Sequence, residues 1–173
     1  MNFDLQPFLE NDNLVLRPTT KNDFEGLFEV ASDPLLWEQH PAKERATREG
    51  FRTFFDQGIH SGGMLSIIAK EQNRIIGSSR FKFLSEELSA VEIGWTFLAR
   101  KYWGGQINRQ MKQLMIEHAH QFVKNVLLFI DKSNIRSFKA AEKIGALRLN
   151  ETHPLHCLQK TDYHCTYLIA KHE

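Results

Sequence analysis

Three runs of strand-forming residues in the middle of the chain limit its fold more than any other feature. The runs are rich in β-branched and aromatic residues, and they span residues 64–70, 74–84 and 89–99. Short polar links, including KEQNR and SEEL, join them. Links this short connect antiparallel neighbours, because a parallel pair needs a crossover of about a dozen residues. The sequence therefore predicts three consecutive antiparallel strands.

A long amphipathic helix follows these strands, and the pair Gly104-Gly105 opens it. Its apolar side chains recur at helical spacing on one stripe. The stripe contains Ile107, Met111, Leu114, Met115, His118, Ala119, Phe122 and Val123. A single apolar stripe beside a run of strands predicts that the helix packs against a sheet.

The first third of the chain predicts one strand and two or three helices. The strand is expected at residues 14–18, where a proline closes it. Thr20 can cap a helix over about residues 21–30, and a helical turn is expected between residues 32 and 40. A further helix carries apolar side chains at helical spacing, namely Phe51, Phe54, Phe55 and Ile59.

The last third alternates again between strands and helices. A strand is expected at residues 126–131, followed by a helix from Asn134 to Ile144 that Gly145 ends. Residues 146–152 and 163–171 are expected to complete the sheet. The order predicts one α/β (α+β) domain over residues 1–173. Its sheet is mixed and mostly antiparallel, with about seven strands and helices on both faces.

Charge and composition exclude several classes of partner. The 22 Lys and Arg residues nearly balance the 21 Asp and Glu residues, so no broad surface for nucleic acid or an anionic membrane is expected. No apolar run approaches the ~20 residues that span a bilayer, and no signal-peptide pattern begins the chain. We expect a cytoplasmic protein, monomeric or homodimeric, with Cys157 and Cys165 as free thiols.

The Gly104-Gly105 pair points to an anion site at the start of the long helix. The first N–H groups of a helix have no helical partner, and two glycines let a pyrophosphate approach them. The segment is neither a Walker loop nor a dinucleotide Gly-x-Gly-x-x-Gly motif, so ATP and NAD are poor candidates. An ordinary tight turn is the alternative explanation for the pair.

Residues 14–171 resemble the GNAT superfamily of N-acyltransferases, and within it the Rim-type branch of ribosomal-protein N-terminal acetyltransferases. The segments that carry the resemblance are LVLRP, DPLLWEQHP, IIGSSRF, VEIGWTFLARKYWGG and DKSNIRSFKAAEKIGA. The last two resemble the pyrophosphate motif and the second cofactor motif of that family. One departure stands out, because Gln106 occupies a position that is normally small, so the chain resembles a subgroup with YWGG…N in place of YWGKGY…E.

The resemblance implies acetyl-CoA as cosubstrate, an amine acceptor and no metal. The residues that it assigns to the cofactor are Phe97, Leu98, Lys101, Trp103, Gly104, Gly105, Gln106, Ile107, Asn108, Asn134, Ser137, Phe138 and Lys143. It assigns Trp37, His40 and Trp95 to the acceptor pocket. Lys139 and Lys143 either meet the 3′-phosphate of CoA or form a solvated cationic face.

The same resemblance implies direct attack of the amine on the acetyl thioester in a ternary complex. Residues 90–98 correspond to the strand that pairs with pantetheine, where Gly94 suits a bulge or a close approach. Glu92 is the candidate base, and its alternative role is a structural or surface carboxylate. An N-terminal amine of pKa ~8 needs ~1.4 kcal/mol to be neutral at pH 7, whereas lysine needs ~4.6 kcal/mol, so a weak base suffices for the former.

The proton donor to the leaving thiolate is less defined. Many family members use a tyrosine in the second cofactor helix, but this segment contains none, and Phe138 cannot donate a proton. Ser137 matches a serine proposed for this role in the Rim-type branch. Tyr163 and Tyr167 are the alternatives on the last strand.

Two other function classes remain open at the level of sequence. One is a non-catalytic CoA-binding regulatory protein, which the missing tyrosine and the displaced glycine allow. The other is a zinc-binding module, whose ligands would come from His153, His156, Cys157, His164 and Cys165. The acceptor is also open between a peptide or protein N-terminus and a small-molecule amine.

Overall fold

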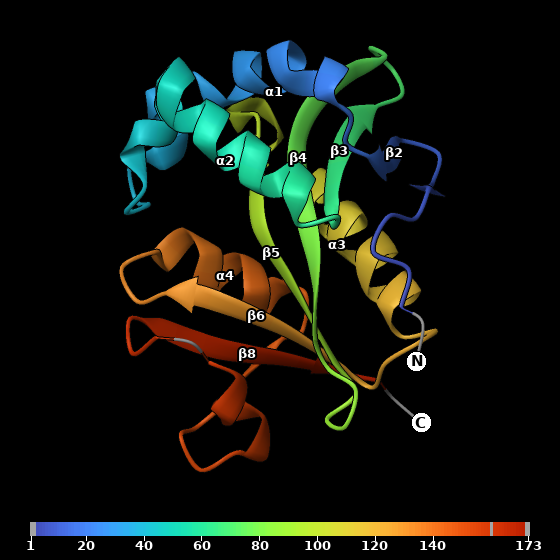
Figure 1. Ribbon diagram of the computed structural model, residues 1–173, viewed down its shortest axis with the longest axis vertical. Coiled ribbons are helices and arrows are strands. Elements are labelled where there is room, and N and C mark those ends of the chain that lie inside the picture. Colours follow the sequence, from blue (N-terminus) through green and yellow to red (C-terminus); the bar gives the residue numbers. More distant parts are fainter. Residues whose placement is uncertain (1–2, 160, 172–173) are drawn as a thin grey trace.

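The computed structural model describes residues 3–159 and 161–171, and this part of the chain builds one eight-stranded sheet (Figure 1). The strands lie in the order β1-β2-β3-β4-β5-β6-β8-β7. Their bounds are Leu9–Glu10 (β1), Leu14–Pro18 (β2), Met64–Ala69 (β3), Arg74–Ser85 (β4), Ala90–Leu98 (β5), Asn125–Asp131 (β6), Leu147–Arg148 (β7) and His164–Ala170 (β8). All neighbours are antiparallel except β5 and β6, which are parallel. The predicted mixed, mostly antiparallel sheet is therefore confirmed.

The sheet differs from the prediction at its two edges. β1 is an additional short edge strand that the sequence did not predict, because two paired residues leave no alternation to detect. At the other edge, the strand predicted over residues 146–152 was too long. Only Leu147 and Arg148 pair with β8, and both are exposed. Pro154–Leu158 forms an unpredicted 3-10 helix, η5.

The helices of the described residues fall close to their predicted positions. The α-helices are Phe24–Ala31 (α1), Arg48–His60 (α2), Gln106–Ala119 (α3) and Ile135–Lys143 (α4). The other short 3-10 helices are Lys21–Asp23 (η1), Pro34–Trp37 (η2), Lys43–Ala46 (η3) and Arg100–Tyr102 (η4). One boundary was wrong: α3 ends at Ala119, so Phe122 and Val123 lie in the following turn, although both still pack on the core.

Two buried clusters place the helices on opposite faces of the sheet. In the larger cluster, Met111, Met115 and Ala119 of α3 pack on the strands. In the smaller cluster, aromatic side chains of α1 and α2 gather around Phe97 of β5. Figure 1 shows α1 and α2 in front of the strands and α3 behind them. Helices on both faces were predicted, and this is confirmed.

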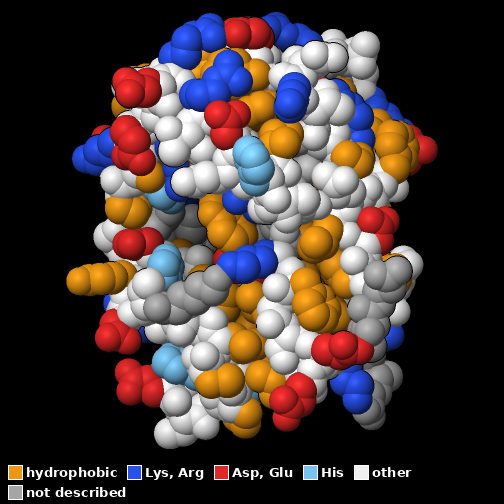
Figure 2. Space-filling view, viewed as in Figure 1, with side chains coloured by type: hydrophobic (Ala, Val, Ile, Leu, Met, Phe, Trp, Pro, Cys, Tyr) orange, Lys and Arg blue, Asp and Glu red, His pale blue; other side chains and the backbone are white. Residues whose placement is uncertain are grey.

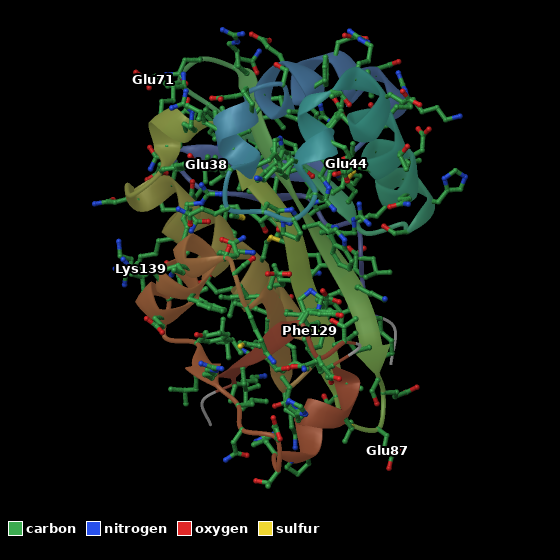
Figure 3. The ribbon with its side chains drawn as sticks, turned by 90° about the vertical axis from the view of Figure 1, so that its left-hand side faces the viewer. Glu38, Glu44, Glu71, Glu87, Phe129 and Lys139 are labelled. Carbon is green, nitrogen blue, oxygen red and sulfur yellow. The ribbon has the colours of Figure 1, made fainter. Side chains whose placement is uncertain are left out.

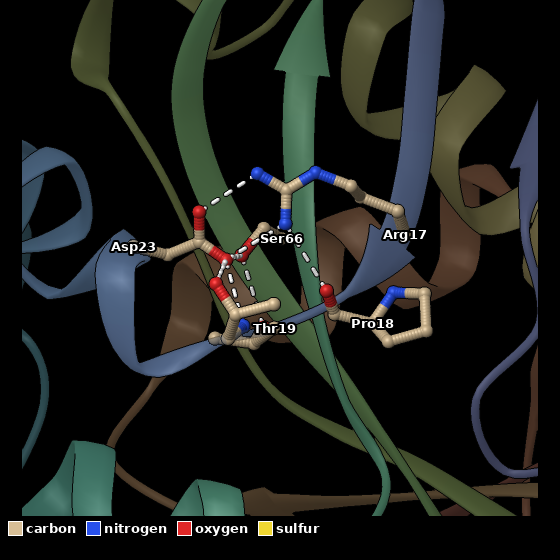
Figure 4. Close-up of polar contacts among 6 residues, drawn as sticks. Arg17, Pro18, Thr19, Asp23 and Ser66 are labelled. Atoms are coloured by element: carbon tan, nitrogen blue, oxygen red, sulfur yellow. Dashed lines mark hydrogen bonds and ion pairs between the residues drawn. The ribbon is translucent and has the colours of Figure 1, made fainter.

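A buried polar contact fixes the entry to α1 (Figure 4). Arg17 of β2 donates two hydrogen bonds of 2.7 Å to the carboxylate of Asp23. The backbone N–H of Thr20 donates to the same carboxylate at 2.7 Å. Thr19 and Ser66 hydroxyls, 2.9 Å apart, lie beside it. The contact ties β2 and β3 to the start of the first helical segment.

Candidate active site

Strands β5 and β6 pair only at their first residues and then separate. Ala90, Val91 and Glu92 pair with Asn125, Val126 and Leu127. Beyond these pairs β5 continues to Leu98 and β6 to Asp131 without further pairing between them in the described chain. Backbone groups on the facing edges of the two strands are therefore left without a strand partner, and they can bind an extended ligand.

A cavity of about 740 Å³ lies where the strands separate. Its lining comes from residues 92–98 of β5, residues 128–131 of β6, the first two turns of α3, one face of α4 and the segment from Leu36 to Arg45, together with Lys82 of β4 and His164 of β8. Figure 2 shows the molecule hollowed near the middle of this face. In Figure 3 the lining residues Glu44 and Phe129 mark the two halves of the molecule that meet at the cavity.

β5 carries a bulge where it borders this cavity. Gly94 pairs with Arg80 and Phe97 pairs with Ser78, so Trp95 and Thr96 together oppose a single residue of β4. Trp95 has a φ of 52°, a left-handed conformation that is uncommon for a bulky residue and typical of functional sites. The sequence predicted a bulge or a close approach at Gly94, and the structure places the bulge one residue later.

Gly94 instead allows the close approach of the Glu92 carboxylate. A Cβ atom added to Gly94 would lie 2.9 Å from Glu92 Oε1. Glu92 is 7% exposed and lines the cavity, so the candidate base is buried at the bulge rather than solvated. Burial lowers the pKa of Arg80 to about 10 and that of Lys112 to about 7, and the charge of Glu92 opposes both shifts.

The start of α3 forms one end of the cavity. Gly104 lines the cavity with a φ of 70°, and no atom lies within 4 Å of a Cβ built there. Gly105 is the N-cap residue and supplies no side-chain hydrogen bond, so no side chain of the cap occupies the first N–H groups of the helix. Such groups bind anions. Asn108, one turn on, also lines the cavity.

The start of α4 forms the neighbouring wall. Asn134 is the predicted N-cap, and its Oδ1 accepts a 3.1 Å hydrogen bond from the backbone N–H of Ser137. Both residues line the cavity. The guanidinium of Arg136 lies 3.9 Å over the ring of Trp103 and donates to the carbonyl oxygen of Leu36 at 2.8 Å. This contact joins α4, the approach to α3 and η2.

The predicted acceptor-pocket residues line the same cavity. Trp37 and Trp95 line the cavity, and the Trp37 indole N–H donates to the carbonyl oxygen of Ala31 at 2.8 Å. His40 also lines it, and burial together with the nearby charge of Arg45 lowers its pKa to about 4. The imidazole is therefore neutral near pH 7. Its Nδ1 accepts a 3.0 Å hydrogen bond from the N–H of Ala42.

Several residues that the resemblance assigned to the cofactor do not line this cavity. They are Lys101, Gly105, Gln106, Ile107, Phe138 and Lys143, whereas Phe97, Leu98, Trp103, Gly104, Asn108, Asn134 and Ser137 do line it. Ile107 and Phe138 pack on the larger core. Lys143 is exposed on α4, as is Lys139, which Figure 3 labels. Tyr163 and Tyr167 also lie outside the lining, so neither alternative proton donor reaches the cavity.

Sequence reasoning missed several residues of the cavity wall, among them Lys112, Arg45 and Thr96. Lys112 follows Asn108 by four residues, so the two share a face of α3, and that spacing was the available signal. Arg45 lies 4.4 Å over the ring of Phe54 and 5.5 Å over that of Trp37. Arg45 lies in η3, and the sequence does not specify the path of the chain that brings η3 to the cavity.

The predicted histidines and cysteines of the C-terminal segment do not form a metal site. Across residues 3–159 and 161–171, no three His, Cys, Asp or Glu side chains gather where they could hold a metal ion. The zinc-module alternative therefore gains no support. None of the helices in the described residues is long and apolar enough to cross a membrane.

Comparisons with known proteins agree with this geometry. Residues 13–147 match the family described as an acetyltransferase (GNAT) domain. An acetyltransferase of the GNAT family from Bacillus anthracis superimposes with a TM-score of 0.71 at 20% identity, covering 94% of this chain and 96% of that one. The Salmonella typhimurium enzyme that modifies the N-terminal serine of the 50S ribosomal subunit protein L7/L12 gives 0.72 at 19% identity, covering 94% and 97%. A Vibrio cholerae spermidine N-acetyltransferase, in complex with CoA and spermine, gives 0.64 at 13%, covering 91% and 94%.

Proposed function

The chain belongs to the GNAT family of acetyltransferases, and on that premise we propose that it transfers the acetyl group of acetyl-CoA to a primary amine by direct attack in a ternary complex. The single observation that carries the proposal is the cavity between β5 and β6. It joins a helix N-terminus at one end to a buried carboxylate at the bulge.

The residues at the cavity fit a CoA thioester. Gly104 leaves open space where a Cβ would lie, and the uncapped N–H groups of α3 suit a pyrophosphate. The unpaired edges of β5 and β6 suit the amides of pantetheine. Ser137 and Asn134 of α4 face the same cavity. The backbone supplies most of these groups, so Gln106 does not prevent binding.

In the proposed reaction Glu92 is the base and acts directly or through one water molecule. Acetyl-CoA supplies an activated acetyl thioester. Glu92 accepts the proton that the attacking amine loses as the N–C bond forms. An N–H group at the bulge of β5, beside Trp95, polarises the carbonyl oxygen of the thioester. Ser137 is the donor that the family resemblance assigns to the leaving thiolate.

We propose that the acceptor is the N-terminal amine of a peptide rather than a polyamine. The three acidic lining residues, Glu44, Glu92 and Asp131, are matched by the basic lining residues Arg45, Lys82, Lys112 and Arg136. His40 is neutral there, because its pKa is lowered to about 4 by burial and by Arg45. Arg45 is positively charged and packs over the rings of Trp37 and Phe54. A polycationic acceptor in the pocket would be repelled by this guanidinium, so the pocket disfavours a polyamine. An N-terminal amine also costs only ~1.4 kcal/mol to deprotonate at pH 7.

Calorimetry and thiol release test this function. The purified protein is titrated with acetyl-CoA, and thiol release is then followed with peptides that have free N-termini, with spermidine, and with an N-terminally blocked lysine peptide. We expect acetyl-CoA binding and turnover chiefly of the free N-termini. Failure to bind acetyl-CoA contradicts the proposal. Binding without turnover of any amine would favour the non-catalytic alternative, and preferential turnover of spermidine would overturn the acceptor assignment.

A further inference from the structure

Lys112 is a buried cation whose position the reaction described above does not explain. Its side chain is 8% exposed, lies in α3 among the methionines of the larger core, and lines the cavity. Burying an ammonium group costs several kcal/mol unless it is paired or loses its proton. An apolar side chain would pack at this position without that cost. A buried lysine at this position therefore calls for a chemical explanation.

The Lys112 ammonium is held at the bulge of β5. Its Nζ donates a 2.8 Å hydrogen bond to Thr96 Oγ1. Because Thr96 accepts this bond, its own proton is available to the hydroxyl of Ser79, whose oxygen lies 2.8 Å away. Ser79 in turn donates to the carbonyl oxygen of Gly94 at 3.5 Å. The network links the amine to the backbone that borders Glu92.

An ammonium group has three N–H donors, and Thr96 is the hydrogen-bond acceptor that the described residues supply to it. The remaining donors are available to a group inside the cavity. Asn108 lies one turn earlier on the same face of α3, toward the helix N-terminus. In the proposed reaction the pantetheine arm runs from the pyrophosphate at Gly104 between β5 and β6 to the bulge of β5, where Lys112 is bonded to Thr96. The Lys112 position thus corresponds to the reacting end of the arm.

The electrostatic environment makes this amine a proton donor near neutral pH. Burial lowers its pKa to about 7, and the facing carboxylate of Glu92 on β5 limits the shift. Other charged or titratable groups line the same cavity from the neighbouring elements, namely His40, Glu44, Arg45, Lys82, Asp131, Arg136 and His164. A thiol has a pKa of ~8.5, so transfer of a proton from this ammonium to a thiolate is favourable.

We propose that Lys112 is the catalytic acid that protonates the departing CoA thiolate. This assignment rests on the proposed acetyl transfer and replaces Ser137 in that role. As the amine nitrogen bonds to the acetyl carbon, the C–S bond breaks and its electron pair stays on sulfur. The Lys112 ammonium gives its proton to that sulfur, while Glu92 holds the proton lost by the amine. Proton return from Glu92 to Lys112 through solvent restores both groups.

Three lysine variants separate this role from a structural one. Lys112→Met removes the charge and the proton, and Lys112→Arg keeps a charge that does not act as an acid. Lys21→Met is the matched control, because Lys21 is exposed in η1 and does not line the cavity. The first measurement is the ultraviolet absorbance of the thiolate of bound CoA across neutral pH, which needs no turnover. Calorimetry with CoA establishes that each variant binds.

We expect Lys112→Arg to hold about tenfold more thiolate than Lys112→Met at the same pH, since a nearby cation lowers a thiol pKa by about one unit or more. Wild type should match Lys112→Arg below pH 7, where Lys112 keeps its charge, and approach Lys112→Met above it. Turnover with acetyl-CoA should fall about 10²-fold in both Lys112 variants. An aryl thioacetate, whose thiolate leaves without a proton, should restore most of their relative rate. Lys21→Met should match wild type.

Two results would overturn the assignment. One is an unchanged thiolate fraction in Lys112→Met that still binds CoA. The other is an equal loss of rate with both thioesters, which is expected of a structural role. Failure of wild type to bind CoA would instead defeat the proposed function, and the inference with it. A selective rescue of Ser137→Ala by the aryl thioester, without rescue of Lys112→Met, would return the role to Ser137.

Discussion

The carboxylate of Glu92 lies so close to Gly94 that a methyl group added to the glycine would sit 2.9 Å from Oε1. The two residues are neighbours on one face of β5, immediately before the bulge at Trp95. The absence of a side chain at position 94 therefore determines where the candidate base lies. This relationship allows the position of the carboxylate to be tested separately from its charge.

Gly94→Ala should lower kcat about tenfold, because relief of the 2.9 Å contact moves the carboxylate by roughly 0.5 Å, and ~1 Å of misplacement costs about 10²-fold. The clash is with the mobile end of a side chain, so the unfolding temperature should change little. Glu92→Gln should lower kcat by about 10²-fold or more. Gly26→Ala in α1 is the control and should leave kcat unchanged. Steady-state kinetics with a peptide amine would contradict this prediction if Gly94→Ala kept full activity.

Gly104 should matter more for CoA affinity than Gly105. Gly104 has a φ of 70°, where alanine costs ~1–2 kcal/mol, and relief of that strain would turn the N–H groups away from the ligand. Gly105 has extended φ and ψ values and only a 3.9 Å contact for an added Cβ. Calorimetry should show about tenfold weaker CoA binding by Gly104→Ala and little change in Gly105→Ala.

The control for strain at Gly104 is Gly62→Ala, because Gly62 has a φ of 67° and lies outside the cavity. It should lose similar stability with no loss of affinity. If Gly104→Ala binds CoA as tightly as wild type, the glycine pair is only a turn. The resemblance assigned both glycines to the cofactor, and the backbone angles make Gly104 the one whose replacement should weaken binding.

Asp23→Asn should lower the free energy of unfolding by about 2 kcal/mol, between the values typical of exposed and fully buried ion pairs. Burial opposes ionisation of Asp23, but hydrogen bonds from Arg17 and Thr20 outweigh it, so its pKa is below 3.8. The stabilisation is therefore present above pH ~4 and is lost as the pH falls through the lowered pKa. Urea unfolding at pH 7 and pH 3 measures it.

The exposed pair between Arg48 and Glu25 provides the comparison. Glu25→Gln should not measurably change urea unfolding, because solvent screens the pair. Equal effects of Asp23→Asn and Glu25→Gln would show that burial of the Arg17 contact adds nothing to stability.

His40 should make the protein less stable as the pH falls below about 6.5. Burial, with help from Arg45, lowers its folded pKa to about 4, so the unfolded chain binds more protons between pH 4 and pH 6.5. Stability contributed by the neutral ring is complete above pH 6.5 and decreases down to about pH 4. His40→Gln should flatten the pH dependence of unfolding in this interval. An unchanged slope in the variant would contradict the burial of the ring.

Much of the fold was predictable from local patterns. The runs that form β3, β4 and β5 carry enough β-branched and aromatic residues to predict strands. Asn134, a favourable N-cap residue, predicted the start of α4. The short edge strands β1 and β7 were not predictable, because each has only two residues and little burial. The end of α3 was also missed, since Val123 stays buried after the helix has ended.

The candidate site was predictable where a motif specifies backbone geometry. Gly104, Asn134 and Ser137 all line the cavity. It was not predictable where long side chains from distant segments converge. Lys112 looked like one of many helical lysines, and only its hydrogen bond to Thr96 shows that it is turned inward. Arg45 reaches the same cavity from the short helix η3.

The sequence by itself therefore determined the kinds of element, their order and the glycines that a helix-terminal anion site requires. These depend on short-range periodicity and on backbone freedom, which are local properties. The tertiary structure alone decided how far β5 and β6 separate, where the bulge falls, and that Glu92 and Lys112 share one cavity. These depend on strand register and packing between residues far apart in the chain, and those contacts also set the charges and pKa values of the site.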